Sequence, residues 1–171
     1  MEKEKHSINT FYLVVSVFLW VFTVAWMVII FMLSSDSGVE SSEKSAFAVS
    51  VFYTYLKLII PEVIIRKLFH IFEFSVLSIM IFLSSYSTNN VSETTTYKAD
   101  AKSQIKTANE FCILISLWIS GLYATFDEYH QLFVNGRNGS VMDVLYDLIG
   151  IVATLIIIRF IISISLMKDK S

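Results

Sequence analysis

The feature of this chain that most constrains its fold is the run from Phe11 to Leu33, 23 residues that include no Asp, Glu, Lys, Arg or His. A helix of this length crosses the hydrocarbon core of a bilayer. The run ends at Ser34, Ser35 and Asp36 instead of a small-residue cleavage site, so we interpret it as an uncleaved membrane span and not as a signal peptide. The chain is therefore expected to fold within a membrane.

Three further apolar runs follow, and the composition agrees with them. Hydrophobic residues make up 55% of the chain and charged residues 16%, and the mean hydropathy is +0.65. These values are typical of a membrane protein. We predict spans at about 11–33, 63–83, 111–130 and 145–167, the third of which is long enough only if its helix includes Asp127 to His130. The formal net charge of -2 offers no basic surface, which excludes nucleic acid as a partner.

Residues 44–60, between the first two predicted spans, favour a different kind of helix. From Ala46 to Ile60 they are apolar apart from Ser50, Thr54 and Lys57, which recur at helical spacing and form one polar stripe. A short helix with such a stripe is typical of the membrane interface. Pro61 is expected to end it.

The segment between the second and third predicted spans is polar. Residues 84–110 contain almost no apolar side chain, so we expect a solvated, flexible loop. The predicted fold class is therefore all-α, an integral membrane bundle of four transmembrane helices with an additional interfacial helix between the first and second. It forms a single domain over residues 1–171.

The polar residues of the predicted spans lie near one end of each span. If consecutive helices alternate in direction, four polar clusters meet on one side of the membrane: Ser34 and Ser35, then Lys67, His70 and Glu73, then Asp127 to Gln131, then Asp143 and Asp147. Lysines and arginines number seven on the amino-terminal segment, the 84–110 loop and the tail, against five on the other connections. By the positive-inside rule we expect both termini in the cytoplasm and the polar site on the outer face.

The candidate site consists of ionisable and amide side chains at this end of the bundle: Lys67, His70, Glu73, Asp127, Glu128, His130, Gln131, Arg137, Asp143 and Asp147. Ionisable groups inside a span are costly and are therefore often functional. His70 and Glu73 could form a proton-transfer pair or could simply pair within the bundle, and both interpretations stay open. Asp127 and His130 share a helix edge, but no His-x-x-x-His or similar pairing accompanies them, so we predict neither a metal nor another cofactor.

Helical spacing assigns orientations within the second span. Lys67, His70 and Phe74 are separated by three and four residues, so they share one face, with Glu73 adjacent to it. Arg66 and Lys67 also have an alternative role as anchors at the membrane interface.

The connection between the third and fourth spans is rich in turn residues. Asn135-Gly136 and Asn138-Gly139 are turn signals that predict a tight loop with Arg137 at its tip, where its guanidinium suits a phosphate or carboxylate. Ser140-x-x-Asp143 is a capping-box pattern, so Asp143 has a structural alternative. Asp147 lies one turn further in and is not explained by capping.

Three motifs combine in this chain: Arg66-Lys67-x-x-His70-x-x-Glu73-Phe74, Asp127-Glu128-x-His130-Gln131-x-Phe133-x-x-Gly136-Arg137-x-Gly139 and Asp143-Val144-x-x-Asp147-x-x-Gly150, preceded by Phe31-x-x-Ser34-Ser35. Together they resemble the VanZ-like family of small bacterial membrane proteins. The resemblance implies several spans and an association of the name-giving member with resistance to the glycopeptide teicoplanin, but no particular activity. Asn135 stands where many relatives have proline, and Phe74 where tyrosine is common, so we expect a looser loop and no role for a tyrosine hydroxyl.

The leading hypothesis is a multi-pass protein of the bacterial cell membrane whose outward polar site binds or acts on an anionic envelope component. Given the resemblance, a lipid-linked cell-wall precursor is the candidate partner besides the lipid bilayer, and lowered susceptibility to teicoplanin would follow. One alternative is a membrane enzyme acting on a lipid-linked or phosphorylated substrate, with His70 or His130 as general base and Arg137 stabilising negative charge. Another is a small transporter, which is disfavoured because only Arg159 lies in the cytoplasmic half.

Overall fold

The computed structural model describes residues 7–93 and 101–168. Within them the elements are β1 (Ser7–Ile8), α1 (Thr10–Ser34), α2 (Gly38–Leu56), α3 (Glu62–Asn89), β2 (Ser92–Glu93), α4 (Ala101–Gln131) and α5 (Val141–Lys168). Four helical stretches are long and apolar enough to cross a membrane: Thr10–Ser34, Glu62–Asn89, Ala108–Gln131 and Val141–Leu166. The predicted all-α bundle of four spans, with a further helix between the first and second, is confirmed.

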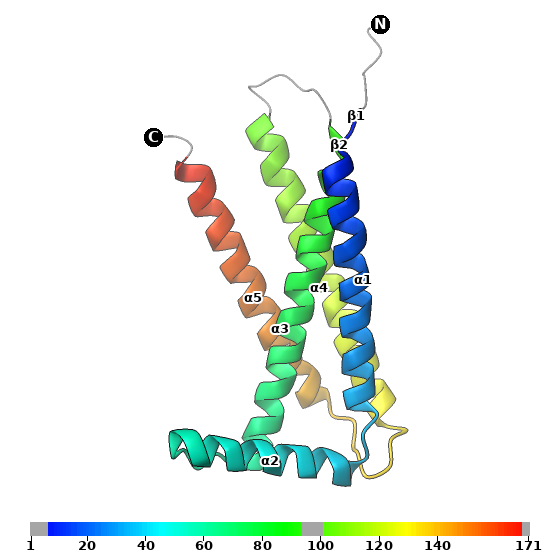
Figure 1. Ribbon diagram of the computed structural model, residues 1–171, viewed down its shortest axis with the longest axis vertical. Coiled ribbons are helices and arrows are strands. Elements are labelled where there is room, and N and C mark those ends of the chain that lie inside the picture. Colours follow the sequence, from blue (N-terminus) through cyan, green and yellow to red (C-terminus); the bar gives the residue numbers. More distant parts are fainter. Residues whose placement is uncertain (1–6, 94–100, 169–171) are drawn as a thin grey trace, which may run out of the picture.

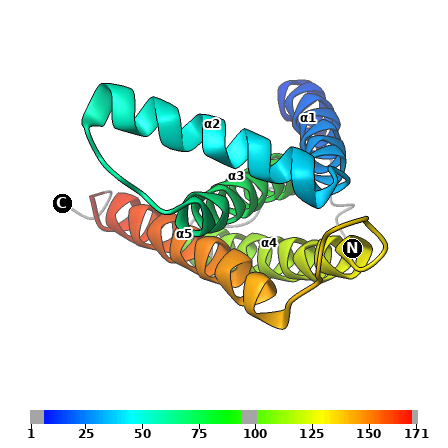
Figure 2. The ribbon, with the colours of Figure 1, turned by 90° about the horizontal axis from the view of Figure 1, so that it is seen from below.

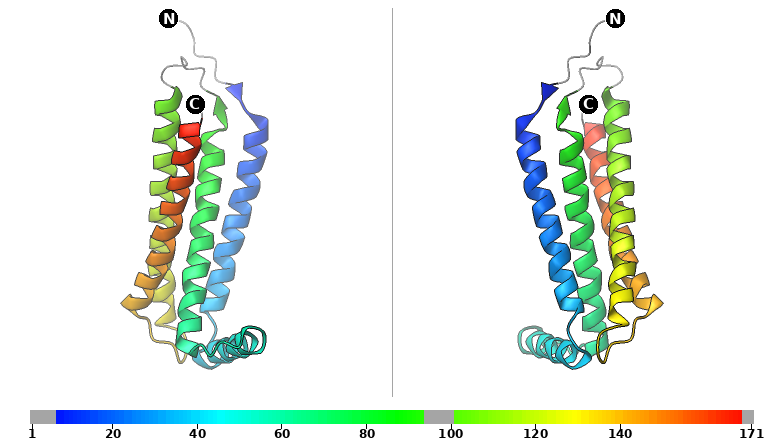
Figure 3. Two further views of the ribbon diagram at one scale, coloured as in Figure 1. Left: turned by 90° about the vertical axis from the view of Figure 1, so that its left-hand side faces the viewer. Right: turned by 90° about the vertical axis from the view of Figure 1, so that its right-hand side faces the viewer.

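The four spans run side by side, and α2 lies across one end of them (Figure 1). The start of α1 and the end of α5 lie at the opposite end (Figure 1, Figure 3). α3 is the central helix, because it packs against α1, α2, α4 and α5. Figure 2 shows it between α2 on one side and α4 and α5 on the other. Successive spans therefore alternate in direction, and the polar ends of all four lie near α2.

The interior between the spans is apolar. One buried cluster combines residues from all four spans: Ile30, Phe74, Leu77, Ile81, Ala124, Ile151 and Leu155. Phe74 packs against the ring of Tyr123, with 6.3 Å between ring centroids, and the Tyr123 hydroxyl donates to the carbonyl of Met27 at 2.6 Å. Phe74 is therefore a core residue. On the outside, apolar side chains such as Phe22 and Ile157 are exposed, as expected of a surface that faces lipid.

α2 begins earlier and ends earlier than the predicted helix at 44–60. Ser37 and Glu40 form a capping box, in which the Ser37 amide donates to the Glu40 carboxylate at 2.9 Å. This hydrogen bond lowers the pKa of Glu40, which is exposed. Lys57 adopts a left-handed conformation, with φ of 54°, and its amide donates to Tyr53 at 3.0 Å, so the helix ends there. Pro61 instead precedes the first residue of α3.

The prediction of a loop over residues 84–110 is wrong at both of its ends, because α3 continues to Asn89 and α4 begins at Ala101. The hydroxyls in the extension of α3 bond to its own carbonyls, as Ser84 does to Met80 and Thr88 does to Ser84, each at 2.8 Å. Serine and threonine can therefore continue a helix that packs on a neighbour. Residues 94–100 lie outside the described part of the chain.

β1 and β2 join the start of α1 to the end of α3. They pair antiparallel, with Ser7 opposite Glu93 and Ile8 opposite Ser92. The amide of Asn9 donates to the carbonyl of Val91 at 2.9 Å. The two helices are thus fixed to each other at the end of the bundle remote from α2.

Candidate functional site

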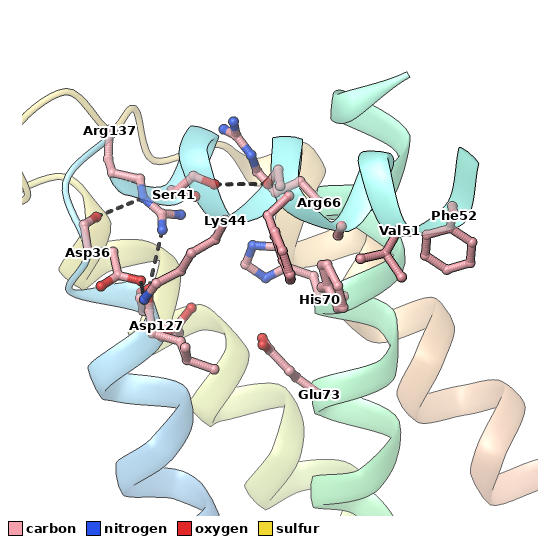
Figure 4. A pocket seen from close by; sticks show the side chains of 16 residues that line it. Asp36, Ser41, Lys44, Val51, Phe52, Arg66, His70, Glu73, Asp127 and Arg137 are labelled. Atoms are coloured by element: carbon pink, nitrogen blue, oxygen red, sulfur yellow. Dashed lines mark hydrogen bonds and ion pairs between the residues drawn. The ribbon is translucent and has the colours of Figure 1, made fainter. Parts of the chain in front are cut away.

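A cavity of about 460 Å³ lies beneath α2, between this helix and the ends of the spans (Figure 4). The side chains that line it come from α1, α2, α3, α4 and the two connections next to them: Leu33, Ser34, Asp36, Ser41, Lys44, Ser45, Phe47, Ala48, Val51, Phe52, Arg66, Phe69, His70, Glu73, Asp127 and Arg137. We call this space the α2 cavity. It brings together residues up to a hundred positions apart in the sequence.

The α2 cavity has a polar end and an apolar end. Figure 4 shows Arg137, Asp36 and Asp127 gathered on one side, and Val51 and Phe52 on the other. His70 and Glu73 project from α3 into the space between them (Figure 4). A molecule that fills the cavity therefore meets charged groups at one end and hydrocarbon at the other.

The turn signals predict Arg137 at the tip of a loop, but this prediction is wrong. The Arg137 side chain is folded back onto α1. Its Nε donates to the carbonyl of Asp36 at 3.1 Å, and its Nη2 to the carbonyl of Leu33 at 3.3 Å. Its Nη1 donates to Oε1 of Gln131 at 3.3 Å. Burial and the charge of Arg66 lower the pKa of Arg137, but an arginine stays protonated at any ordinary pH.

Two glycines hold the Arg137 loop against the start of α2. Gly136 has a left-handed conformation, with φ of 73°, at the turn that Asn135-Gly136 predicts. The Gly38 amide donates to the carbonyl of Asn135 at 3.0 Å. A Cβ on Gly38 would collide with the carbonyl oxygen of Gly136, so only glycine permits this approach. The loop and α2 therefore position Arg137 together.

Gln131 links Arg137 to Asp127. While its Oε1 accepts from the guanidinium, its Nε2 donates to Oδ2 of Asp127 at 3.2 Å. Asp127 is only 2% exposed, and its Oδ1 has no hydrogen-bond partner among the described residues. The predicted group of Asp127, Gln131 and Arg137 is thus brought together as one connected set at the polar end of the cavity.

His70 faces Asp147, which comes from α5. The distance from Nδ1 of His70 to Oδ1 of Asp147 is 3.5 Å, and the Asp147 side chain is completely buried. Within the described residues, neither oxygen of Asp147 has a hydrogen-bond partner. His70 thus lies between the α2 cavity and a buried carboxylate.

Three charged residues of the cavity, Asp36, Lys44 and Arg66, are absent from the predicted site. Lys44 of α2 makes an ion pair with Asp36 at 2.5 Å. Arg66 of α3 pairs with Glu62 at 3.3 Å and contacts Ser42 at 3.4 Å, while its buried Nε has no partner among the described residues. Arg66 could have been found from spacing, because positions 66, 70 and 73 lie on one helical stripe.

Two predicted site residues belong to other contacts. The Nζ of Lys67 lies over the ring of Tyr146, 4.0 Å from its centroid, so it does not share the cavity face with His70. His130 stacks on Phe31, with 4.4 Å between ring centroids, and its Nε2 is 3.1 Å from Oγ of Ser35. Neither side chain lines the α2 cavity.

The predicted capping box of Asp143 is replaced by a contact from α4. The amide of Ser140 donates to the Glu128 carboxylate and not to the carboxylate of Asp143. The Ser140 hydroxyl accepts from the amide of Met142 at 3.2 Å and caps α5. Glu128 therefore joins α4 to the start of α5, and half-buried Asp143 stays beside the site without lining the cavity.

Within the described residues, no group of three or more His, Cys, Asp or Glu side chains is arranged to hold a metal ion. A family model described as VanZ/LLP1 matches residues 18–163 of the chain. No match to a curated protein or to a solved structure is found. The matched region contains every residue that lines the α2 cavity.

Proposed function

We propose that this chain, which belongs to the VanZ/LLP1 family of membrane proteins, binds the anionic head of a membrane amphiphile in the α2 cavity. The observation that carries the proposal is the change from charged to apolar side chains along the cavity (Figure 4). A lipid has the same division between head and tail. A water-soluble anion would leave the apolar end unused.

Arg137 is the residue that we assign to the anion. Its three contacts are to two backbone carbonyls and one amide oxygen, none of which carries a full negative charge. By contrast, Lys44 is paired with Asp36 and Arg66 with Glu62. A guanidinium has five N–H donors, so Arg137 keeps donors for a phosphate or carboxylate, which it binds with strong charge-assisted hydrogen bonds.

The apolar end suits a hydrocarbon chain. Phe47, Val51 and Phe52 of α2 face Phe69 of α3 across the cavity. Phe47 and Phe69 are exposed, with 72% and 45% of their surface accessible. In this proposal the cavity opens toward the surrounding membrane between these rings, and a lipid tail leaves it without crossing polar surface.

The size of the cavity limits what can be held inside. A volume of about 460 Å³ accommodates roughly 15 non-hydrogen atoms, if each takes about the 30 Å³ of a water molecule. A phosphate and the first part of a hydrocarbon chain fit this volume. The sugars and peptide of a wall precursor would lie outside the cavity.

In this proposal the amphiphile is a component of the bacterial cell envelope, and a lipid-linked wall precursor is the candidate. Both termini lie in the cytoplasm, so α2 and its cavity face outward, where envelope lipids and glycopeptides meet. Sequestering or changing such a lipid would alter the target of teicoplanin and lower susceptibility to it.

The test measures lipid binding by the purified full-length protein with native mass spectrometry. The probes are phosphatidic acid, undecaprenyl phosphate, inorganic phosphate and neutral diacylglycerol. We expect both phosphorylated lipids to bind and the other two probes to bind weakly, because head and tail both contribute. Arg137→Gln should lower the affinity for phosphorylated lipid roughly tenfold or more, since a hydrogen bond to a charged group contributes about 1.5–3 kcal/mol.

Arg159→Gln is the matched control. Arg159 pairs with Glu110 at 3.0 Å, far from the α2 cavity. Equal binding by the two variants, or equal binding of diacylglycerol and phosphatidic acid, would refute the proposal. Arg137→Lys separates charge from hydrogen-bond geometry, and we expect it to recover part of the affinity.

A further inference from the structure

We propose that His70, oriented by Asp147, acts as a general base for the hydrolysis of a phosphate monoester bound in the α2 cavity. This inference rests on the proposed function, because it requires the phosphorylated head to occupy the polar end. It goes further by assigning a reaction, a catalytic residue and a positioning residue to the site.

The first argument is the orientation of the imidazole. Its Nδ1 is buried and lies 3.5 Å from Oδ1 of Asp147, while the ring lines the cavity. Figure 4 shows the His70 ring projecting from α3 into this space. With Nδ1 directed at the carboxylate, Nε2 on the opposite side of the ring is the nitrogen available to a ligand.

The second argument is the position of Asp147. Burying a carboxylate is costly unless it is paired or hydrogen-bonded. Among the described residues Asp147 has an ion-pair contact only with His70, and no hydrogen bond satisfies either oxygen. A carboxylate beside Nδ1 does have a chemical role, since it keeps the proton on Nδ1 and leaves Nε2 as a base.

The third argument is the length of the contact. At 3.5 Å, the separation between His70 and Asp147 exceeds an ordinary N–H···O hydrogen bond. Catalytic hydrogen bonds are often long without substrate and shorten when substrate binds. His130, the other candidate base of the sequence, contacts Ser35 and Phe31 and lies outside the cavity.

The reaction follows from these placements. Arg137 holds the phosphate, and Nε2 of His70 takes a proton from a water molecule. The water oxygen forms a bond to phosphorus while the bond from phosphorus to the lipid oxygen breaks. The lipid oxygen receives a proton from His70, so the products are a lipid alcohol and inorganic phosphate, and His70 returns to its initial state.

The experiment measures release of inorganic phosphate from phosphatidic acid in detergent micelles by the purified full-length protein. Phosphatidylglycerol, a phosphodiester, serves as the comparison substrate and should release none. We expect His70→Ala to lower kcat by roughly a hundredfold or more, with a smaller change in KM, because general-base catalysis contributes about 10²–10⁴ in rate. Asp147→Asn should also lower kcat, by up to about 10⁴-fold, because loss of the carboxylate that orients a general-base histidine favours the wrong tautomer.

Chemical rescue separates catalysis from structure. Added imidazole should restore part of the activity of His70→Ala, because the missing side chain leaves room beside the cavity. It should restore no activity to Asp147→Asn. Asp147→Glu should recover more activity than Asp147→Asn. His130→Ala is the matched control, and we expect its kcat to equal that of the unchanged protein.

The outcomes distinguish this inference from the proposed function. Binding of phosphatidic acid without phosphate release would overturn the catalytic inference and leave the binding proposal in place. Loss of both binding and release would overturn both. Full activity of a folded His70→Ala variant, or absence of imidazole rescue together with a lowered melting temperature, would assign His70 a structural role and refute the inference.

Discussion

Buried polar side chains at the α2 end of the bundle differ in hydrogen bonding from those farther from α2. Away from α2, Thr23 in the middle of α1 and Ser84 of α3 share a hydrogen bond at 3.0 Å, and Trp20 donates to Thr88 at 3.0 Å. The α2 end, by contrast, contains most of the buried polar atoms that have no hydrogen-bond partner among the described residues: Ser34 Oγ, Arg66 Nε, His70 Nδ1, Asp127 Oδ1, Glu128 Oε2 and both carboxylate oxygens of Asp147.

This difference indicates what each end contributes. Paired polar groups hold the helices together at low cost, because each hydrogen bond replaces one to water. Unpaired buried groups lower stability and persist where another role requires them. We therefore expect removal of a polar or charged group, with the shape of the side chain kept, to destabilise the protein away from α2 and to be tolerated, or even stabilising, at the α2 end. Three variants test this comparison, and a fourth, Gly38→Ala, tests the packing of α2; all can be measured by thermal unfolding in detergent.

The largest effect is expected for Gly38→Ala. Its methyl group would collide with the Gly136 carbonyl and separate α2 from the loop that carries Arg137. Overpacking of this kind costs about 1–3 kcal/mol of unfolding free energy, and lipid binding should fall with it. Gly121→Ala is the control, since its Cβ would meet only Leu148 at 3.5 Å. An equal loss in both variants would show that the close approach of Gly38 is unimportant.

Asp147→Asn should raise the free energy of unfolding, whereas Gly38→Ala should lower it. An unsatisfied buried polar group costs about 1–3 kcal/mol, and more when it is charged. Asn keeps the shape of the side chain without the charge, so we expect a gain of about 1 kcal/mol in the free energy of unfolding. The melting temperature should rise while phosphate release falls. A lower melting temperature would mean that the carboxylate serves the fold, and it would break the comparison between the two ends.

Thr23→Val tests the paired end. It removes the hydroxyl that contacts Ser84 and keeps the shape of the side chain. We expect a loss of about 1 kcal/mol in unfolding free energy and unchanged lipid binding. Thr125→Val is the control, because the Thr125 hydroxyl bonds only within its own helix, to Gly121 at 2.9 Å. If Thr125→Val cost as much, the contact between α1 and α3 would not explain the effect.

Arg159→Gln should have the smallest effect. Arg159 and Glu110 form an ion pair at 3.0 Å, with 63% and 37% of their side-chain surfaces exposed. Exposed pairs contribute about 0–1 kcal/mol, so we expect a change below roughly 0.5 kcal/mol. A substantially larger loss of unfolding free energy would indicate that this ion pair is buried. The difference in polar pairing between this region and the α2 end would then not hold.

The sequence predicts the spans and the meeting of their polar ends, because apolar length and alternation depend on local composition. It does not predict which face of α3 turns to the cavity. Arg66 and Lys67 are adjacent and chemically similar, and the choice between them depends on the positions of α2 and of Tyr146. That information lies in the packing of helices that are far apart in the chain.

The ends of the helices are mispredicted for a related reason. Composition favours a loop where serine and threonine are frequent, but Ser84 and Thr88 bond to the carbonyls of α3 and to side chains of α1. Likewise, the Ser140 pattern indicates a capping box with Asp143, yet the Glu128 carboxylate from α4 occupies that position. In each case a tertiary contact replaces the local one.

The hydrogen bonds that attach α2 to the rest of the protein are distributed unevenly along the helix. Under the proposed function, this distribution determines the route by which an amphiphile reaches the cavity. Among the described residues, the hydrogen bonds between α2 and its surroundings involve Gly38 and Lys44 as donors and Ser42 as acceptor, all in its first half. Its second half ends at Lys57, followed by a short non-helical connection in which Ile59 is 84% exposed. The fixed half covers the polar end and the free half covers the apolar end. Under the proposed function, a lipid would therefore enter sideways from the bilayer, head first, and its tail would not have to be threaded through a ring of protein.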